Sequence, residues 1–239
     1  MARIKVFGVG SCGRNILNYI IKTGLRDAEF AHADTNSASF GADTRSARVL
    51  LGKRSTRSKA ELNPAMGRVA ANQSMNALRK QVAGCDIVFI CAGMGGGTGT
   101  GAAPVIARAA EQSGALIIGF VTTPFDFEGN RKNLAKGGID ALLQYVDGLF
   151  CVSNNKLLTM APPKSTFQEI MECGNKIGYS VLTMTSDLLR KPRWTQNFPR
   201  DFIEIANVLQ CGGLAMIGGD WAEADGRQPI DRRGITLYL

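Results

Sequence analysis

Two glycine-rich segments carry the residue types best suited to chemistry in this sequence. The larger reads GMGGGTGTG from Gly93 to Gly101, with six glycines among nine residues, and follows the apolar run DIVFIC. Because glycine lets successive backbone N–H groups point into one concavity, such a segment binds anions, and a helix that starts nearby adds its positive end. The hydroxyls of Thr98 and Thr100 can add hydrogen bonds. We therefore predict a di- or triphosphate site here.

The smaller glycine segment allows a second interpretation. Gly8, Gly10 and Gly13 in GVGSCG spell G-x-G-x-x-G, and Asp34 lies 21 residues beyond Gly13. This spacing fits the dinucleotide fingerprint, in which the acid binds a ribose hydroxyl, and on its own it would predict an NAD(P)-dependent oxidoreductase. That interpretation leaves the larger segment unexplained. Two glycine loops at the ends of separate strands would instead hold one triphosphate from two sides.

Composition narrows the classes of protein. The chain has 239 residues, of which 45% are hydrophobic and 20% charged, as in ordinary globular domains. No apolar run approaches the length of a membrane span, and the apolar start is too short for a signal peptide, so we expect a cytoplasmic protein. The six cysteines form no C-x-x-C pair and His32 is the one histidine, which argues against a zinc site or a disulfide framework. We expect a structural role for His32.

A basic stretch stands out within the formal net charge of +8. Six positive residues without an intervening acid lie at Arg45, Arg48, Lys53, Arg54, Arg57 and Lys59. Such a cluster can contact phosphate or nucleic acid, or simply form a solvated loop. We favour the solvated loop. The chain has no zinc-finger pattern and no aromatic-studded strand, so we expect no nucleic-acid partner.

The order of elements predicts an α/β fold with a Rossmann-like, mostly parallel sheet and helices on both faces. Strands are expected over 3–10, 29–34, 86–91, 116–122, 149–153 and 214–217, and helices over 15–23, 64–82, 104–113 and 201–210. Pro104 would occupy the first turn of its helix. A long central helix is expected from the capping box of Thr166 and Glu169 to about Leu189. The last 20 residues are poorly patterned.

The motif GMGGGTGTG resembles the signature of the tubulin/FtsZ superfamily, and residues 3 to 218 are similar to its FtsZ branch. The resemblance implies that the chain binds GTP and GDP, with Mg²⁺ held between the phosphates and not by protein side chains. It also implies a GTPase of the cell-division cytoskeleton whose hydrolysis is coupled to head-to-tail self-assembly. The partners would be further copies of the chain or full-length FtsZ.

The resemblance assigns the nucleotide contacts residue by residue. The nucleotide would contact the glycine loops and the loops near them, at Gly10, Ser11, Cys12, Gly13, Arg14, Asn15, Asn36, Asn63, Gly95, Gly96, Gly97, Thr98, Gly99 and Thr100. Glu128 would bind the ribose hydroxyls, and Lys132, also assigned to the nucleotide site, lies where the family usually has arginine. The guanine would be read by Asn154 and Asn175 and covered by Met171.

In this family a second subunit completes hydrolysis, and Asp201 and Glu204 match the two acids that would orient the attacking water. Both could instead only stabilise the start of their helix. The family usually has Asn at the position of Pro199 and Asp at that of Glu204. Asp34-Thr35-Asn36 also inverts the family's usual Asn-Thr-Asp order. From these departures and from the end of the chain 35 residues after Glu204, we expect weak hydrolysis and impaired assembly. The alternative is a non-hydrolysing regulator or cap of full-length FtsZ filaments.

These expectations divide the chain into three parts. Residues 1–165 would form the GTP-binding domain and residues 166–190 the central helix. Residues 191–239 would hold the catalytic loop and a remnant of a truncated second domain.

Overall fold

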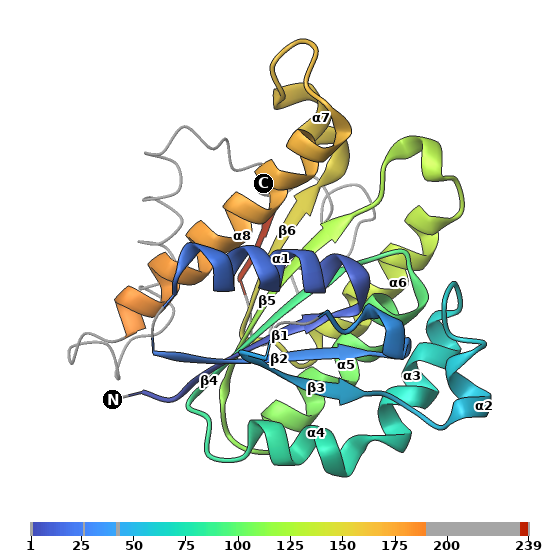
Figure 1. Cartoon of the computed structure of the whole chain (residues 1–239), viewed down its shortest axis with the longest axis vertical. Helices are drawn as coiled ribbons and strands as arrows, with labels where there is room; N and C mark the ends of the chain where they lie inside the picture. Colours follow the sequence, from blue (N-terminus) through green and yellow to red (C-terminus); the bar gives the residue numbers. More distant parts are fainter. Residues whose placement is uncertain (1, 26, 42–43, 190–234, 239) are drawn as a thin grey trace.

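The structure is a computed structural model that describes residues 2–25, 27–41, 44–189 and 235–238. These residues form one sheet covered by helices on both faces (Figure 1). The strands are β1 (Ile4–Val9), β2 (Ala28–Asp34), β3 (Ser46–Leu50), β4 (Ile87–Gly93), β5 (Leu116–Thr123), β6 (Gly148–Ser153) and β7 (Ile235–Tyr238). The helices are α1 (Gly10–Thr23), α2 (Arg54–Arg57), α3 (Pro64–Gln73), α4 (Met75–Val82), α5 (Gly97–Glu111), α6 (Arg131–Leu143), α7 (Asn154–Met160) and α8 (Phe167–Leu189). Two 3₁₀ turns are η1 (Ser37–Ser39) and η2 (Asp126–Glu128).

The strand order is β3-β2-β1-β4-β5-β6-β7, and every neighbouring pair is parallel. The predicted α/β fold with a parallel sheet is therefore confirmed. The order reverses between β1 and β4, the strands that precede the two glycine segments. In open parallel sheets, ligands bind beyond the carboxyl ends of the strands at such a reversal.

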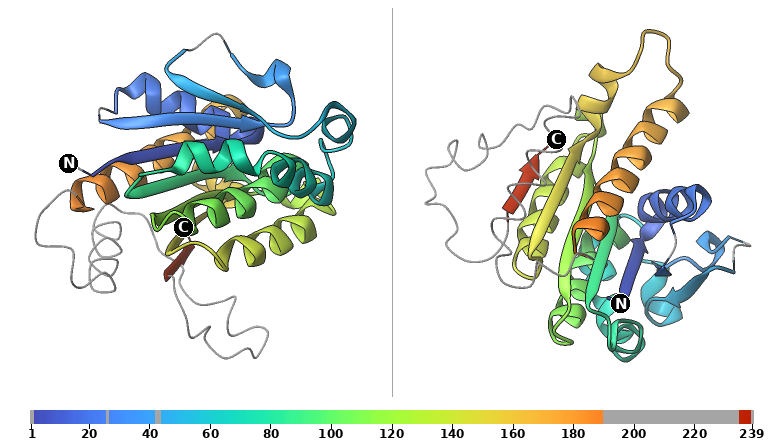
Figure 2. Two further views of the ribbon diagram at one scale, coloured as in Figure 1. Left: turned by 90° about the horizontal axis from the view of Figure 1, so that it is seen from below. Right: turned by 90° about the vertical axis from the view of Figure 1, so that its left-hand side faces the viewer.

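Alternate strand residues feed two apolar layers. On β4, Val88 and Ile90 lie with the inner faces of α3, α4, α5 and α6, whereas Ile87 and Phe89 lie with α1, α7 and α8. Figure 2 shows α1 and α8 on the same side of the sheet. Burial on both faces explains why the strands read as continuous runs of Val, Ile and Phe. In the described ranges, no helix is both long and apolar enough to cross a membrane.

The starts of two helices differ from the prediction. We expected α1 to begin at residue 15 and α5 at Pro104, but both begin inside the glycine segments, at Gly10 and Gly97. Pro104 lies in the interior of α5, where its ring and missing N–H disfavour a helix by about 3 kcal/mol. The helix starts early because Gly97, Gly99 and Gly101 press its first turns against other backbone, and this burial outweighs the proline.

Other elements depart from the prediction in smaller ways. The helix expected over 64–82 divides at Ser74 into α3 and α4. The capping box of Thr166 and Glu169 is confirmed, and so is the end of α1 at Gly24, which is left-handed. We did not expect β3, α2, α6, α7 or β7. The strand expected over 214–217 and the helix over 201–210 lie outside the described residues.

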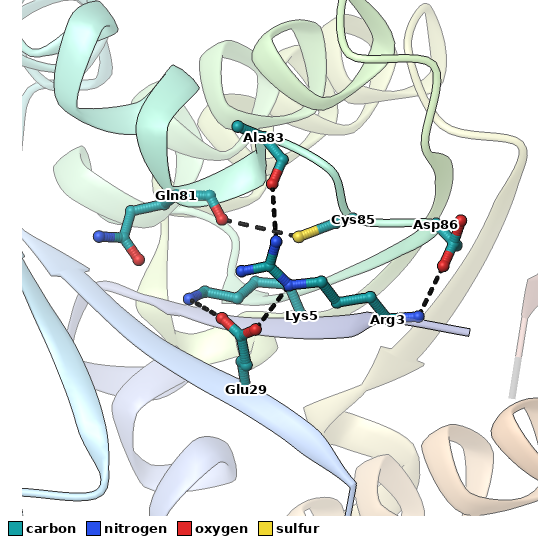
Figure 3. Close-up of polar contacts among 7 residues, drawn as sticks. All are labelled: Arg3, Lys5, Glu29, Gln81, Ala83, Cys85 and Asp86. Atoms are coloured by element: carbon teal, nitrogen blue, oxygen red, sulfur yellow. Dashed lines mark hydrogen bonds and ion pairs between the residues drawn. The ribbon is translucent and has the colours of Figure 1, made fainter. Parts of the chain in front are cut away.

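A polar cluster closes the amino end of the sheet, opposite the glycine segments (Figure 3). Glu29 on β2 accepts hydrogen bonds from Arg3 Nε at 2.7 Å and from the buried Lys5 Nζ at 3.1 Å. The backbone N–H of Arg3 donates to Asp86 at 2.6 Å, and its guanidinium donates to the carbonyl of Ala83 at 3.2 Å. These contacts hold together the starts of β1, β2 and β4.

The contact between α3 and α5 yields the first testable prediction. A Cβ at Gly101 would lie 2.2 Å from the carbonyl oxygen of Pro64 and 2.6 Å from the backbone nitrogen of Arg68. Because backbone cannot move aside cheaply, we expect Gly101→Ala to lower the free energy of unfolding by about 1–3 kcal/mol, measured by urea denaturation. Gly137→Ala on α6 is the control, since nothing lies within 4 Å of its Cβ. It should be neutral or stabilising by up to about 1 kcal/mol, and an equal loss in both variants would contradict the prediction.

Candidate functional site

A cleft of about 990 Å³ lies at the carboxyl edge of the sheet. It is lined by the segments that follow β1, β2, β4, β5 and β6, together with α2 and the first turns of α8. The volume is that of a site for a small molecule the size of a nucleotide. The two glycine segments meet here, as the sequence suggested.

Helices α1 and α5 direct their N-termini at the cleft without a side-chain cap. By contrast, Asn63 caps α3 with hydrogen bonds from the N–H groups of Ala65 and Met66. Helix N-termini carry unsatisfied N–H groups and a partial positive charge. Two uncapped N-termini at one cleft therefore form a site for an anion such as a phosphate chain.

Glycine brings the two helix starts together. Gly10 has a φ of +69°, and a Cβ there would lie 3.2 Å from the backbone nitrogen of Gly99. A Cβ at Gly13 would lie 2.2 Å from the carbonyl oxygen of Cys91, which lets α1 approach β4. Side chains at these positions would separate the two N-termini that line the cleft.

The other end of the cleft is built for a flat polar ring. Asn154 at the start of α7 and Asn175 on α8 are half-buried, and in the described part of the chain neither amide makes a hydrogen bond. Met171 lines the same end. Phe125, which stacks on Phe127 at 4.9 Å between ring centroids, also lines the cleft. Amides with free donors and acceptors can read the edge of a base while sulfur and aromatic carbon cover its face.

Most of the predicted nucleotide residues line this cleft. They are Gly10, Ser11, Cys12, Asn15, Asn36, Gly96, Gly97, Thr98, Gly99, Glu128, Asn154, Met171 and Asn175. Six do not line it, namely Gly13, Arg14, Asn63, Gly95, Thr100 and Lys132. Asp201 and Glu204 lie outside the described residues.

Several residues outside the lining support it from behind. Thr100 Oγ1 accepts a hydrogen bond from the N–H of Gly95 at 2.8 Å and so shapes the loop. Arg14 donates to the carbonyl of Ser39 at 2.9 Å, which fastens α1 to the segment after β2. Lys132 pairs with Asp126 on the protein surface.

Sequence reasoning missed part of the lining. Arg131, and not its neighbour Lys132, lines the cleft and pairs with Glu128 at 2.5 Å. The basic stretch was expected to be a solvated loop, but Arg54 and Arg57 line the cleft together with Ser58, Glu61 and Leu62. Counted from Arg54, the other four residues follow after three, four, seven and eight positions, which is the spacing of one helical face. This spacing was the signal in the sequence that they share one side.

Comparison with known proteins agrees with this geometry. The model of the Tubulin/FtsZ family, GTPase domain, matches residues 3–162. The chain belongs to the tubulin/FtsZ family. The matched residues include both glycine segments and all six strands from β1 to β6.

Two curated members of the family illustrate the relationship. The chain is 35% identical over 232 residues to the cell division protein FtsZ of Neisseria gonorrhoeae, covering 97% of this chain and 57% of that protein. It is 40% identical over 227 residues to FtsZ of Magnetospirillum gryphiswaldense, covering 94% and 40%. The chain therefore spans about half the length of the curated relatives it matches.

A solved structure of the family shares the fold. The structure described as an empty FtsZ dimer from M. jannaschii matches with a TM-score of 0.73 and 31% identity, over 80% of this chain and 56% of that one.

Within the tubulin/FtsZ family fold, Asp34 acts on the loop after β2. Its side chain is 4% exposed, its Oδ1 accepts the N–H of Asn36 at 3.0 Å, and His32 Nε2 lies 3.5 Å from its Oδ2. Burial acts to raise the pKa of Asp34, but the contacts with His32, Asn36 and Ser39 together hold it below its usual value. Asp34 also lines the cleft, and its Oδ2 has no hydrogen-bond partner within the described part of the chain.

The described residues of the cleft do not favour a nucleophilic cysteine or a metal site formed by side chains. Cys12 lines it, but burial raises the pKa of its thiol, and Thr122 Oγ1 lies 3.4 Å from the sulfur. A protonated thiol is a weak nucleophile. Among the described residues, no group of three or more His, Cys, Asp and Glu side chains could hold a metal ion.

The environment of Asp34 yields the second prediction. Because its folded pKa is lowered, the ionised carboxylate stabilises the fold above its unfolded pKa of about 3.9, and this contribution is lost as the pH falls through the folded value. We expect Asp34→Asn to lower the free energy of unfolding by about 1–3 kcal/mol at pH 7.

The difference from the unmodified chain should shrink as the pH falls below about 4, and urea unfolding from pH 7 to pH 3 measures it. Asp140→Asn on the exposed face of α6 is the control and should change stability little at any pH. A deficit for Asp34→Asn that stays constant with pH would contradict the prediction.

Proposed function

We propose that this chain binds GTP and GDP in the cleft and is a GTPase domain of FtsZ type. The observation that carries the proposal is the convergence of two uncapped helix N-termini, of α1 and α5, at the reversal of strand order. The phosphate chain would lie against both. This arrangement would hold phosphate through backbone N–H groups, without a lysine side chain.

The guanine would lie at the other end of the cleft. Asn154 and Asn175 would pair with its polar edge, Met171 would cover its face, and the paired Glu128 and Arg131 would face the ribose. A carboxylate accepts hydrogen bonds from ribose hydroxyls, and an amide offers both donors and an acceptor to the base.

We further propose that hydrolysis is coupled to head-to-tail self-assembly in cell division in the cytoplasm. The carboxylates of Asp201 and Glu204, which the structure does not describe, would orient water at the terminal phosphate of a neighbouring copy. Bound Mg²⁺ would supply charge neutralisation between the phosphates. The protein side chains would position the nucleotide, and the acids would act from the second copy.

The test is isothermal titration of the purified chain with GTP, GDP, ATP and NAD in the presence of Mg²⁺. Binding of GTP and GDP without ATP or NAD is the expected result, followed by phosphate release and sedimentation assays for hydrolysis and assembly. Binding of NAD alone would overturn the proposal. If GTP binds but neither phosphate release nor sedimenting polymer is detected, the nucleotide-binding part of the proposal stands and the hydrolysis and assembly parts are wrong.

Removal of one guanine-reading amide is the third prediction. We expect Asn175→Ala to weaken GTP and GDP binding by about 10- to 100-fold, because an unpaired guanine edge would remain in the cleft. Calorimetric titration measures the loss. Lys176→Ala changes an exposed neighbour on α8 that does not line the cleft, and should leave both affinities within about threefold. Equal effects of the two substitutions would contradict the assignment.

Removal of the acids is the fourth prediction. Asp201→Asn with Glu204→Gln should lower the rate of GTP hydrolysis by at least about 100-fold and leave GTP affinity unchanged, since the acids would act on bound nucleotide from another copy. Phosphate release and titration on the same sample separate the two effects. Unchanged hydrolysis would remove both residues from the mechanism.

A further inference from the structure

The basic stretch acquires a role from its position in the cleft. We propose that Arg54 and Arg57 of α2 bind the terminal phosphate and make the site prefer a nucleoside triphosphate over the diphosphate. The inference rests on the proposed guanine-nucleotide function and goes beyond it, because neither residue belongs to the glycine segments or to the predicted contacts.

The segment from α2 to the start of α3 presents one face to the cleft. Arg54 and Arg57 share that face, which continues through Ser58 and Glu61. The opposite face is anchored, since Thr56 and Ala60 are buried at 6% and 0% exposure. The segment therefore has a fixed orientation, and the two arginines point to the cleft because their neighbours fill the core.

The segment lies directly against the start of α5. The carbonyl of Glu61 accepts the N–H of Gly97 at 3.1 Å. A Cβ at Gly97 would lie 1.6 Å from the carbonyl oxygen of Ala60. The arginines thus stand beside one of the two uncapped helix N-termini.

The position of the arginines relative to the expected base site indicates which phosphate they would contact. Asn154 and Met171 come from α7 and α8, on the face of the sheet that α1 covers. The α2 segment belongs to the other side, next to α3 and α5, and Figure 1 shows α2 and α8 far apart across the molecule. A nucleotide with its base between α7 and α8 would extend toward α2, so its last phosphate would arrive there.

The charges at this end are available. In the described part of the chain, Arg54 and Arg57 form no ion pair or side-chain hydrogen bond, whereas Arg131 at the ribose end is paired with Glu128. Glu61 is the acid that shares the arginine face. A terminal phosphate adds the negative charge that offsets the two guanidinium groups, and charge-assisted hydrogen bonds from arginine to phosphate are strong and directional.

The experiment compares two double variants that remove the same charge. Arg54→Gln with Arg57→Gln alters the residues that line the cleft, whereas Lys53→Gln with Lys59→Gln alters exposed neighbours in the same segment that do not. Each variant is titrated calorimetrically with GTP, a slowly hydrolysed GTP analogue and GDP, with Mg²⁺ present.

The arginine variant should lose about tenfold or more in affinity for GTP and its analogue and less than about threefold for GDP. The lysine variant should lose less than about threefold for all three ligands. Retained GDP affinity shows that the arginine variant is folded. Arg57→Lys with Arg54 intact should fall between the arginine variant and the unmodified chain, because lysine keeps the charge but not the fork.

Different failures separate the two proposals. If the unmodified chain binds no guanine nucleotide, the proposed function falls and the arginine role falls with it. If the chain binds GTP and GDP but the arginine variant loses both equally, or no more than the lysine variant, the arginine role alone is overturned.

Discussion

The cleft depends on close contact between backbones at the carboxyl edge of the sheet. Gly97 and Gly101 bring α5 against the segment that starts α3, and Gly13 brings α1 against β4. At each point a methyl group would lie within about 2.3 Å of a carbonyl oxygen, far inside contact distance. The glycines thus do more than supply N–H groups. They set the separation between the two helix N-termini and hold the α2 segment at the side of the cleft.

Among the described α-helices, α3 and α8 carry a side-chain cap, whereas α1, α2, α4, α5, α6 and α7 do not. Asn63 caps α3 and Thr166 caps α8, and in each case the capping side chain accepts a hydrogen bond from an N–H group in the first turn. Helices α1 and α5 begin at glycine and have no such cap. Of the uncapped helices, α1 and α5 are the two that begin inside the glycine segments at the cleft, and a Ser or Asp cap would stabilise either of them by about 1 kcal/mol. An anion in the cleft would supply the partner that the first N–H groups of these two helices lack.

Local patterns predicted what is set locally. The apolar run of β4, the glycine at the end of α1 and the capping box of α8 each followed from neighbouring residues, and the structure confirms them. Strand β3 was not predicted, because Val49 is its one buried residue at this edge of the sheet and the sequence therefore shows no apolar pattern. The early start of α5 and the position of Arg57 were not predicted, because contacts between segments distant in the sequence determine them. Thr100 was predicted to donate a hydrogen bond to the ligand. In the structure its hydroxyl accepts the N–H of Gly95, a contact that residue spacing does not indicate.

The all-parallel order of the sheet has a consequence for how the chain folds. Each parallel pair joins segments distant in the chain, as when Ile4 pairs with Ala28 on one side and with Ile87 on the other. Sheets rich in such non-local pairing form slowly, because loop closure must precede the contacts that stabilise it. The cleft draws residues from Val9 to Asn175, so it exists only once those pairings are complete. A ligand of the cleft would therefore stabilise the finished fold over every partly paired intermediate, by about 2.7 kcal/mol at a concentration 100 times its Kd. Ligand supply in the cell would in this way set how often the finished chain reopens and becomes accessible to proteases.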